Sequence, residues 1–435
     1  MKKILIENKS KYIHKLFKNK FQSELIFNYI SLGFLGISGL GLNIIIGLNY
    51  EPSVLGVFNQ VLTLYVIFSM IGSAGISFSV LRSIPSNVKN QDVLQSIVGS
   101  GIAIVSISSL LTTMIFWLSI KPISNFLDSQ LILEAMYCIS PGLFLFSINK
   151  VLLNGVINGL NKMKEYAFFQ SLRYICLFLS IIYAYFISLK GSYLTIIFSF
   201  TEFILFFILI FFISARIEWW LGKDIYFWIK KHFKFGYKSF IGSILIEFNS
   251  KVDILMLGIF LNDKSVGIYS FSAFFAEGFY QILTILQNSY NPILSKQISL
   301  GKKIFIRNFL VLNIRKCYVI LVPLGISIIL FYPLIINLIT NNDIYQKSIN
   351  PFMILISGII IASGYLPFYN LFSMSNLPWL QSIFMLSIVF TNILANLILI
   401  PLFGINGAAI GTTISFVTSI FLFKVFTKKG IGIKI

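Results

Sequence analysis

The chain has 435 residues, of which 57% are hydrophobic and only 11% charged, and its formal net charge is +19. Soluble globular domains contain about 45–50% apolar and about 25% charged residues, so the composition excludes that class. Apolar stretches of about twenty residues or more recur from Leu25 to Phe426, and each is long enough to cross a hydrocarbon core of about 30 Å as a helix. Strictly alternating segments of about ten residues, typical of a transmembrane barrel, are not visible. The sequence therefore predicts an all-α polytopic membrane protein.

About twelve transmembrane helices are expected from the lengths of these stretches. In chain order they cover residues 25–48, 56–81, 95–119, 131–156, 168–188, 191–214, 236–260, 266–293, 308–333, 351–373, 378–400 and 404–426. The first stretch is too long for the apolar core of a signal peptide, and no small-residue cleavage site follows it. The segment 215–235, rich in lysine and tryptophan, is expected to be a cytoplasmic linker at the membrane interface. We therefore expect an N-terminal lobe (1–214), this linker, and a C-terminal lobe (236–435).

The positive charge is unevenly distributed along the chain. With a cytoplasmic N-terminus, the outer loops contain Lys121, Lys190, Lys264 and Lys347, and two more lysines lie within spans. The inner loops, tails and helix ends hold the rest of the 34 Lys and Arg, which is the asymmetry that the positive-inside rule requires. Both termini are therefore predicted to be cytoplasmic, and the lysine-rich N-terminal tail is expected to contact anionic membrane lipids. The net charge thus reflects topology and does not indicate a nucleic-acid partner.

Two segments in the two halves of the chain are similar. IIIGLNYEPSVLGVF (44–58) aligns without a gap with LMLGIFLNDKSVGIY (255–269), at an offset of 211 residues. Two glycines and one aromatic residue match in the two copies: Gly47 with Gly258, Gly56 with Gly267, and Phe58 with Tyr269. Each copy ends an odd-numbered helix and opens the next one, which predicts a parallel repeat about an axis along the membrane normal. Chance similarity between apolar segments is the alternative.

Four segments have a recognisable sequence: LNGVINGLNKMKEYA (153–167), VDILMLGIFLNDKSVGIYSF (252–271), NPILSK (291–296) and IPLFGINGAAIGTTIS (400–415). They resemble the polysaccharide-exporter branch of the multidrug/oligosaccharidyl-lipid/polysaccharide (MOP) flippase superfamily. The resemblance implies two six-helix lobes that form a V around a central cavity, which opens alternately to each side of the membrane. It is strongest to flippases of O-antigen and other undecaprenyl-diphosphate-linked sugars. Members that flip the peptidoglycan precursor tend to carry cationic residues in the first helix, whereas residues 25–48 contain no charge, which argues against that role.

Polar residues within three predicted spans form rows along one face of the helix, at 100° per residue. The fourth helix and its inner end carry Ser147, Lys150, Asn154, Asn158 and Asn161; the seventh carries Ser243, Glu247, Ser250 and Lys251; the eighth carries Glu277, Gln281, Thr284, Asn288 and Asn291. A charge at the bilayer centre costs about 2.5–3.5 kcal/mol, so such residues usually face a cavity or a partner. Three helices with one polar face each predict a hydrated channel between the lobes.

This set of side chains suits a diphosphate-linked glycan, because cations bind phosphates and amide groups bind sugar hydroxyls. The predicted substrate-binding residues are Lys150 and Lys251 within the spans, Arg82 and Arg173 at the inner mouth, and Asn154, Asn158, Gln281 and Asn288. The carboxylates of Glu247, Asp253 and Glu277 are candidates for coupling transport to a proton or cation gradient, and the resemblance places a recurrent family aspartate at Asp253.

Structural interpretations of the same residues stay open. Glu247 precedes Lys251 by four residues, which is the favourable order for an intrahelical ion pair. Asparagine rows also join helices to one another, and arginines at inner helix ends are often plain topological anchors. Glu202 lies alone in a phenylalanine-rich segment, where a partner on a neighbouring helix is expected. Tyr365 and Tyr369, on either side of Pro367, either stack against sugar rings or pack at a kink.

The predicted function is a flippase that moves an undecaprenyl-diphosphate-linked oligosaccharide from the inner to the outer leaflet of the bacterial cytoplasmic membrane. Its expected partners are that substrate, membrane lipids and other polysaccharide assembly proteins. No Gx4GK[ST] loop is present, His14 and His232 lack a second ligand, and the cysteines are scattered, so neither a cofactor nor a metal site is predicted. One alternative is a multidrug exporter of organic cations, which favours a net-acidic cavity. Another is a membrane glycosyltransferase or polymerase, which needs an acidic residue in a substantial outer loop.

Overall fold

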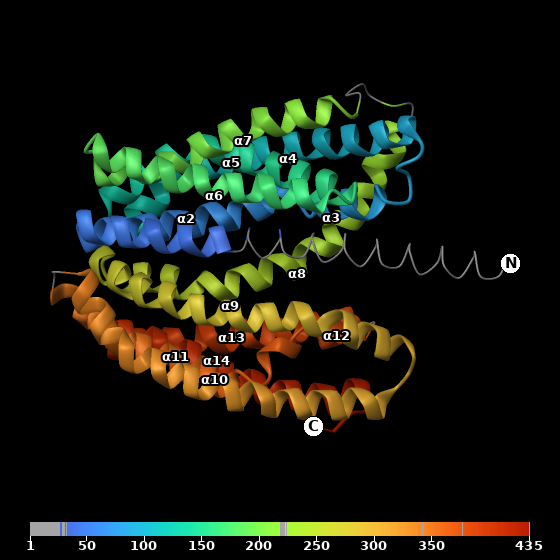
Figure 1. The fold of residues 1–435 in the computed structure, drawn as a ribbon. Coiled ribbons are helices and arrows are strands. Elements are labelled where there is room, and N and C mark those ends of the chain that lie inside the picture. The colour runs from blue at the N-terminus through green and yellow to red at the C-terminus, as the bar shows by residue number, and fades with distance from the viewer. Residues whose placement is uncertain are drawn as a thin grey trace, which may run out of the picture.

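The computed structural model of the chain consists of two helical bundles packed side by side (Figure 1). It describes residues 27, 31, 33–217, 222, 224–340, 343–375 and 377–434, with the side chains of 237–243, 245–247 and 343 outside the description. The lysine-rich N-terminal tail lies outside the described residues. A first apolar helix, Gly33–Asn49, precedes the helices that are labelled in the figure.

The first bundle, called the first lobe below, contains the helices between residues 52 and 214. They are α2 (Pro52–Ser73), α3 (Ile76–Ser83), α4 (Gln91–Phe126), α5 (Gln130–Lys150), the π-helix η1 (Val151–Ile157), α6 (Met163–Phe186), the 3-10 helix η2 (Gly191–Tyr193) and α7 (Ile196–Ser214). Side-chain caps define the helix starts: Asn90 accepts a hydrogen bond from the Val93 amide at 3.3 Å, and Ser129 from the Ile132 amide at 3.3 Å.

The second lobe begins after residue 262. Its elements are α9 (Asp263–Ser299), α10 (Lys303–Ile339), the 3-10 helix η3 (Asp343–Ser348), α11 (Ile349–Ala362), the 3-10 helix η4 (Leu366–Phe368), α12 (Leu371–Met374), α13 (Pro378–Phe403), α14 (Ile405–Phe426) and the π-helix η5 (Thr427–Ile431). Gly404, with a φ of 60°, separates α13 from α14, because only glycine adopts that backbone geometry at little cost.

The long helix α8 (Ile225–Phe260) lies between the lobes and belongs to both (Figure 1). Near its start, Trp228 packs in the hydrophobic core of the first lobe, and the His232 ring lies 2.7 Å from Ser79 Oγ and 3.1 Å from the Ile97 carbonyl. Towards its end, Leu257 and its neighbours pack in the core shared with the second lobe. The helix therefore includes the second half of the predicted linker, and Trp228, expected at the membrane interface, is buried.

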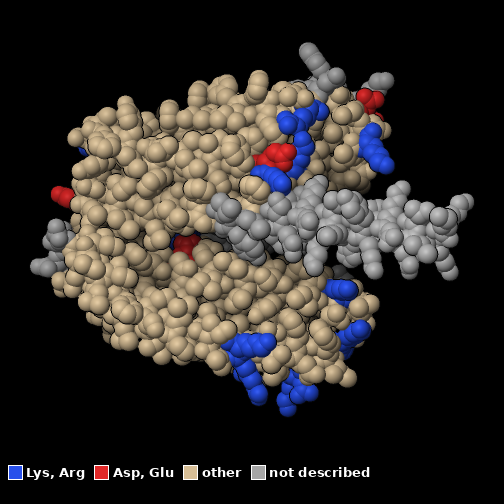
Figure 2. Space-filling view, in the orientation of Figure 1, with Lys and Arg blue, Asp and Glu red and all other residues tan. Residues whose placement is uncertain are grey.

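Nine helices in the described part of the chain are long and apolar enough to cross a membrane. Neither α8 nor α9 is among them, because both carry polar rows, although they cover the predicted seventh and eighth spans. The chain is thus a multi-pass membrane protein, and the count of twelve spans stays a prediction. Figure 2 shows the lysine and arginine side chains of one face gathered over the right-hand half of the molecule, where α3 and α12 lie. The helix ends in that half are those predicted to be cytoplasmic, and this orientation stays a prediction.

Two predicted spans are interrupted in the structure. The second breaks at Ala74 and Gly75, which both adopt a left-handed backbone, so that α2 and α3 are separate helices. The tenth ends at Ala362 and continues through η4, which contains Pro367. Tyr365 and Tyr369 are only 8% and 6% exposed, and the Tyr369 hydroxyl bonds to Ser419 within the lobe. The interpretation of these tyrosines as sugar-stacking residues is therefore wrong for this conformation, and the packing kink is confirmed.

Candidate functional site

The polar row of the fourth predicted helix is partly exposed from Lys150 to Asn158. Between Ser147 and Gly159 every residue is buried except Lys150, Asn154 and Asn158. These three are spaced by four, and residues 151–157 form the π-helix η1. A π-turn contains more residues than an α-turn, so a four-residue spacing there stays close to one line along the helix axis. Ser147, which we expected in the row, is instead buried and donates to the Leu143 carbonyl at 3.2 Å.

The second lobe presents an ion pair near the interface between α8 and α9. Lys251 Nζ lies 3.5 Å from Glu277 Oε2, and these side chains are 22% and 43% exposed. The predicted intrahelical partner, Glu247, has a side chain outside the described residues. In the described structure Lys251 therefore pairs with the next helix, and a residue predicted to bind substrate lies beside one predicted to couple an ion.

The row on α9 runs from this ion pair along the helix. Gln281, Thr284 and Asn291 are partly exposed and Asn288 is exposed, whereas Ala276, Phe279 and Leu283 on the opposite side are buried. Figure 2 shows that the molecule is hollowed between the two lobes, with acidic side-chain atoms visible inside the hollow. The α9 row is thus an accessible polar surface, as the sequence predicts.

The two candidate arginines have different environments. Arg82 is exposed at the end of α3, with its guanidinium 4.9 Å from the centre of the Phe235 ring on α8. Arg173 lies about 15 Å along α6 from Met163, deeper than the inner mouth where we expected it. Its Nε is 3.0 Å from Glu202 Oε1 and its Nη2 donates to Oε2 at 3.1 Å, with Arg173 12% and Glu202 3% exposed.

This buried ion pair is completed by Asn149, whose Nδ2 donates to Glu202 Oε2 at 2.8 Å and to the Glu202 carbonyl at 2.9 Å. A carboxylate removed from water needs such donors as well as its counterion. The expected partner of Glu202 on a neighbouring helix is thus Arg173. The three residues link α5, α6 and α7 inside the first lobe.

Asp253 occupies a buried polar cluster in the second lobe. Its Oδ2 accepts hydrogen bonds from the Tyr269 hydroxyl at 2.9 Å and from the Thr412 hydroxyl, and its Oδ1 accepts from Asn396 Nδ2 at 2.7 Å. Asn396 Nδ2 also donates to Asn392 Oδ1 at 2.9 Å. The cluster joins α8 to α9, α13 and α14, and all three donors to the carboxylate are uncharged.

Residues 30–297 match the family described as "Polysaccharide biosynthesis protein". The chain belongs to this family. A search of curated proteins gave no match. Among solved structures, a lipid II flippase MurJ in an inward closed conformation superimposes with a TM-score of 0.75 at 14% identity, covering 93% of this chain and 87% of that one.

Two further structures extend the likeness within the MOP superfamily. An inward-facing multidrug resistance MATE transporter superimposes with a TM-score of 0.76 at 12% identity, and the match covers 92% of this chain and 94% of the transporter. A MOP superfamily transporter from Pyrococcus furiosus gives 0.62 at 14% identity, with 94% of each chain covered. At these identities the likeness shows a shared fold, which is that of transporters and flippases.

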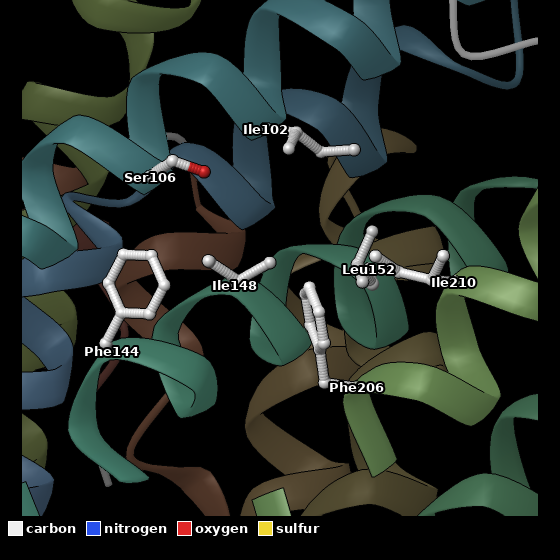
Figure 3. A pocket seen from close by; sticks show the side chains of 7 residues that line it. All are labelled: Ile102, Ser106, Phe144, Ile148, Leu152, Phe206 and Ile210. Carbon is white, nitrogen blue, oxygen red and sulfur yellow. The ribbon is translucent and has the colours of Figure 1, made fainter. Parts of the chain in front are cut away.

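A pocket of about 180 Å³ in the first lobe is almost entirely apolar (Figure 3). It is formed by α4, α5, η1 and α7, and its lining residues are Ile102, Ser106, Phe144, Ile148, Leu152, Phe206 and Ile210. Such a lining suits hydrocarbon and gives a sugar or a phosphate almost nothing to bind. None of the predicted substrate-binding residues lines it.

Sequence reasoning missed the partners of the buried charges. Asn392 and Asn396 stand four residues apart in a mostly apolar helix, which was a usable signal for a polar cluster. Asn149 is adjacent to the predicted row, but helical periodicity alone does not indicate that it turns towards α7. For Arg173 and Glu202, the sequence offered two isolated charges and no measure of their relative depth.

Proposed function

We propose that this protein is a flippase for a lipid-linked oligosaccharide whose head group is an anionic glycosyl diphosphate, with an undecaprenyl-type lipid. The head group crosses through the polar hollow between the lobes by alternating access, while the polyprenyl tail stays in the lipid. The membrane is then the bacterial cytoplasmic membrane, and surface-glycan assembly proteins act on the product. The proposal rests above all on two accessible polar rows: the row that begins at Lys150 in the first lobe, and the row on α9 that begins at the ion pair between Lys251 and Glu277.

The chemistry of the rows supports this cargo. Lys150 and Lys251 supply positive charge for phosphate oxygens, and Arg82 adds another cation at the end of α3. Asn154, Asn158 and the α9 amides can exchange hydrogen bonds with sugar hydroxyls as the glycan moves past. A diphosphate arriving at Lys251 competes with Glu277 for the ammonium group, and the long 3.5 Å separation of that pair indicates a weak existing contact.

The competing functions fit these residues less well. An exporter of organic cations needs a net-acidic cavity, whereas the accessible carboxylate Glu277 is paired with Lys251. A glycosyltransferase or polymerase needs catalytic acids in a folded outer loop, but the loops at the predicted outer ends of the described helices are short. Lipid II, the cargo in the name of one similar structure, is disfavoured because the first span carries no charge.

Energy coupling is assigned in this proposal to Asp253, with Glu277 and Glu247 as further candidates. The Asp253 carboxylate is buried with uncharged donors, so a bound proton or small cation would neutralise it. Hard cations prefer carboxylate, amide and hydroxyl oxygens, and Asn396 Oδ1 has no hydrogen-bond partner among the described residues. The cluster therefore has the donor chemistry for a coupling cation.

The decisive experiment is deletion of the gene followed by leaflet-resolved analysis of lipid-linked sugars. A flippase defect leaves assembled intermediates on the inner leaflet and abolishes the surface glycan. Intermediates that still reach the outer leaflet would rule the function out.

Charge reversal tests the proposed site in the same strain. Lys150→Glu and Lys251→Glu are expected to lose export, because a glutamate repels the diphosphate, whereas Lys347→Glu at the exposed outer loop serves as the matched control. If export stays intact in both Lys150→Glu and Lys251→Glu, these lysines do not belong to the substrate site, although the protein can still be a flippase.

Coupling is tested separately in proteoliposomes with imposed sodium or pH gradients. Transport by the parent protein should respond to one of them, and Asp253→Asn should remove the response while Asp92→Asn, at the exposed start of α4, keeps it. Transport that ignores both gradients would eliminate the coupling mechanism.

A further inference from the structure

The lobes meet along a seam between the first halves of α2 and α9, at their predicted outer ends. A Cβ atom on Gly56 would lie 2.8 Å from the Gly267 amide nitrogen, and one on Gly267 would lie 3.1 Å from the Gly56 nitrogen. These are the two glycines that the sequence repeat pairs. Backbone therefore packs directly on backbone, and the seam leaves no room for a side chain at either position.

The contacts along the seam are reciprocal at the repeat offset. Gly56 packs against the Asp263 carbonyl, and its equivalent Gly267 packs against the Pro52 carbonyl. In the same way, Gly258 packs against Gln60, and its equivalent Gly47 packs against Phe271. In each pair of contacts, every first-lobe residue of one contact is equivalent, at the offset of 211, to a residue of the other contact. The seam is thus a pseudo-isologous interface, in which equivalent patches of two related lobes face each other across an axis.

One polar feature breaks this symmetry. Asp263, at the start of α9, accepts hydrogen bonds from two first-lobe residues: Gln60 Nε2 at 2.8 Å and Ser129 Oγ at 2.6 Å. Gln60 is fully buried, and its partner in the repeat is Phe271; the partner of Asp263 is Pro52. The polar connection therefore exists on only one side of the pseudo-axis, so packing symmetry does not explain it.

We propose that Asp263, Gln60 and Ser129 form an outer latch that holds the lobes shut on the outer side and must open before cargo leaves. Asp263 is the central residue, because both bonds converge on its carboxylate from different helices of the opposite lobe. Hydrogen bonds to a charged acceptor are among the stronger ones, so the latch biases the equilibrium between closed and open outer sides by roughly tenfold or more per bond.

The latch is tested by labelling a cavity cysteine from outside. In a background without native cysteines, Thr284→Cys in the α9 row is exposed to a membrane-impermeant maleimide in right-side-out membranes. Asp263→Ala is expected to raise the labelling rate about tenfold or more. Glu51→Ala is the matched control, since this outer acid accepts its hydrogen bond from Ser53 of its own lobe.

A second measurement separates a latch from a merely structural carboxylate. Ser129→Cys with Asp263→Cys, joined directly as a disulfide by mild oxidation, should block outside labelling at position 284 and recover it on reduction, whereas Asp263→Cys alone after the same oxidation should stay labelled. The latch would be overturned if the tethered protein were labelled at the untethered rate. It would also be overturned if an Asp263→Ala variant with a normal size-exclusion profile were labelled at the same rate as the parent. Labelling needs no cargo, so the result is independent of the proposed function.

Discussion

Gly267→Ala should wedge the outer seam apart, whereas Gly278→Ala on the same helix should not. A Cβ on Gly267 would lie 2.8 Å from the Pro52 carbonyl carbon and closer still to its oxygen, while a Cβ on Gly278 meets nothing within 4 Å. Cβ atoms essentially never approach other heavy atoms within 3.0 Å, and here the obstacle is backbone, which cannot turn aside. The lobes themselves must separate.

The expected cost is that of overpacking, about 1–3 kcal/mol against the closed outer side. Gly278→Ala should instead gain up to about 1 kcal/mol, because alanine is the better helix former. Thermal unfolding in detergent measures the difference in stability, and outside labelling of a cavity cysteine measures opening. Equal melting temperatures and equal labelling rates for the two variants would refute the backbone-on-backbone seam.

Three further variants test the buried polar contacts. Arg173→Met should destabilise the protein by about 3–5 kcal/mol in thermal unfolding, because it leaves the Glu202 carboxylate buried and unpaired, and adding Glu202→Met should restore most of the loss. His232→Ala should cost about 1–3 kcal/mol and increase tryptic cleavage near the start of α8, because the ring connects that end to the first lobe. Asn396→Leu should lower stability by about 1.5–3 kcal/mol by removing a donor to Asp253, and should weaken any stabilisation by sodium measured in the same melts.

Each of these has a clear contrary result. A double variant no more stable than Arg173→Met would mean that the ion pair is not an isolated unit. An unchanged cleavage pattern for the His232 variant would show that other contacts hold the start of α8. Sodium stabilisation that survives Asn396→Leu would place the cation elsewhere.

The positions of most apolar helices and their polar faces were predictable, because hydropathy and the spacing of polar residues are local properties of the chain. The Lys150 row illustrates this: a spacing of four along an apolar span indicated one polar face, and the structure leaves Lys150, Asn154 and Asn158 accessible. The error at Ser147 has a tertiary cause, since this residue packs against α2, where its hydroxyl donates to the Ser69 carbonyl at 3.4 Å, and helical periodicity does not predict that neighbour.

Hydropathy and the spacing of polar residues by themselves determined a polytopic helical protein with polar rows within its spans, whereas the two related halves stay a prediction from the repeat. The partner of each charged side chain was decided only by the tertiary structure: Lys251 pairs with Glu277, Arg173 pairs with Glu202, and Asp263 accepts hydrogen bonds from Gln60 and Ser129. Those pairings depend on the relative depth and rotation of helices that are far apart in sequence. A sequence pattern indicates on which face of its own helix a side chain lies. It does not indicate which residue of another helix packs against that face.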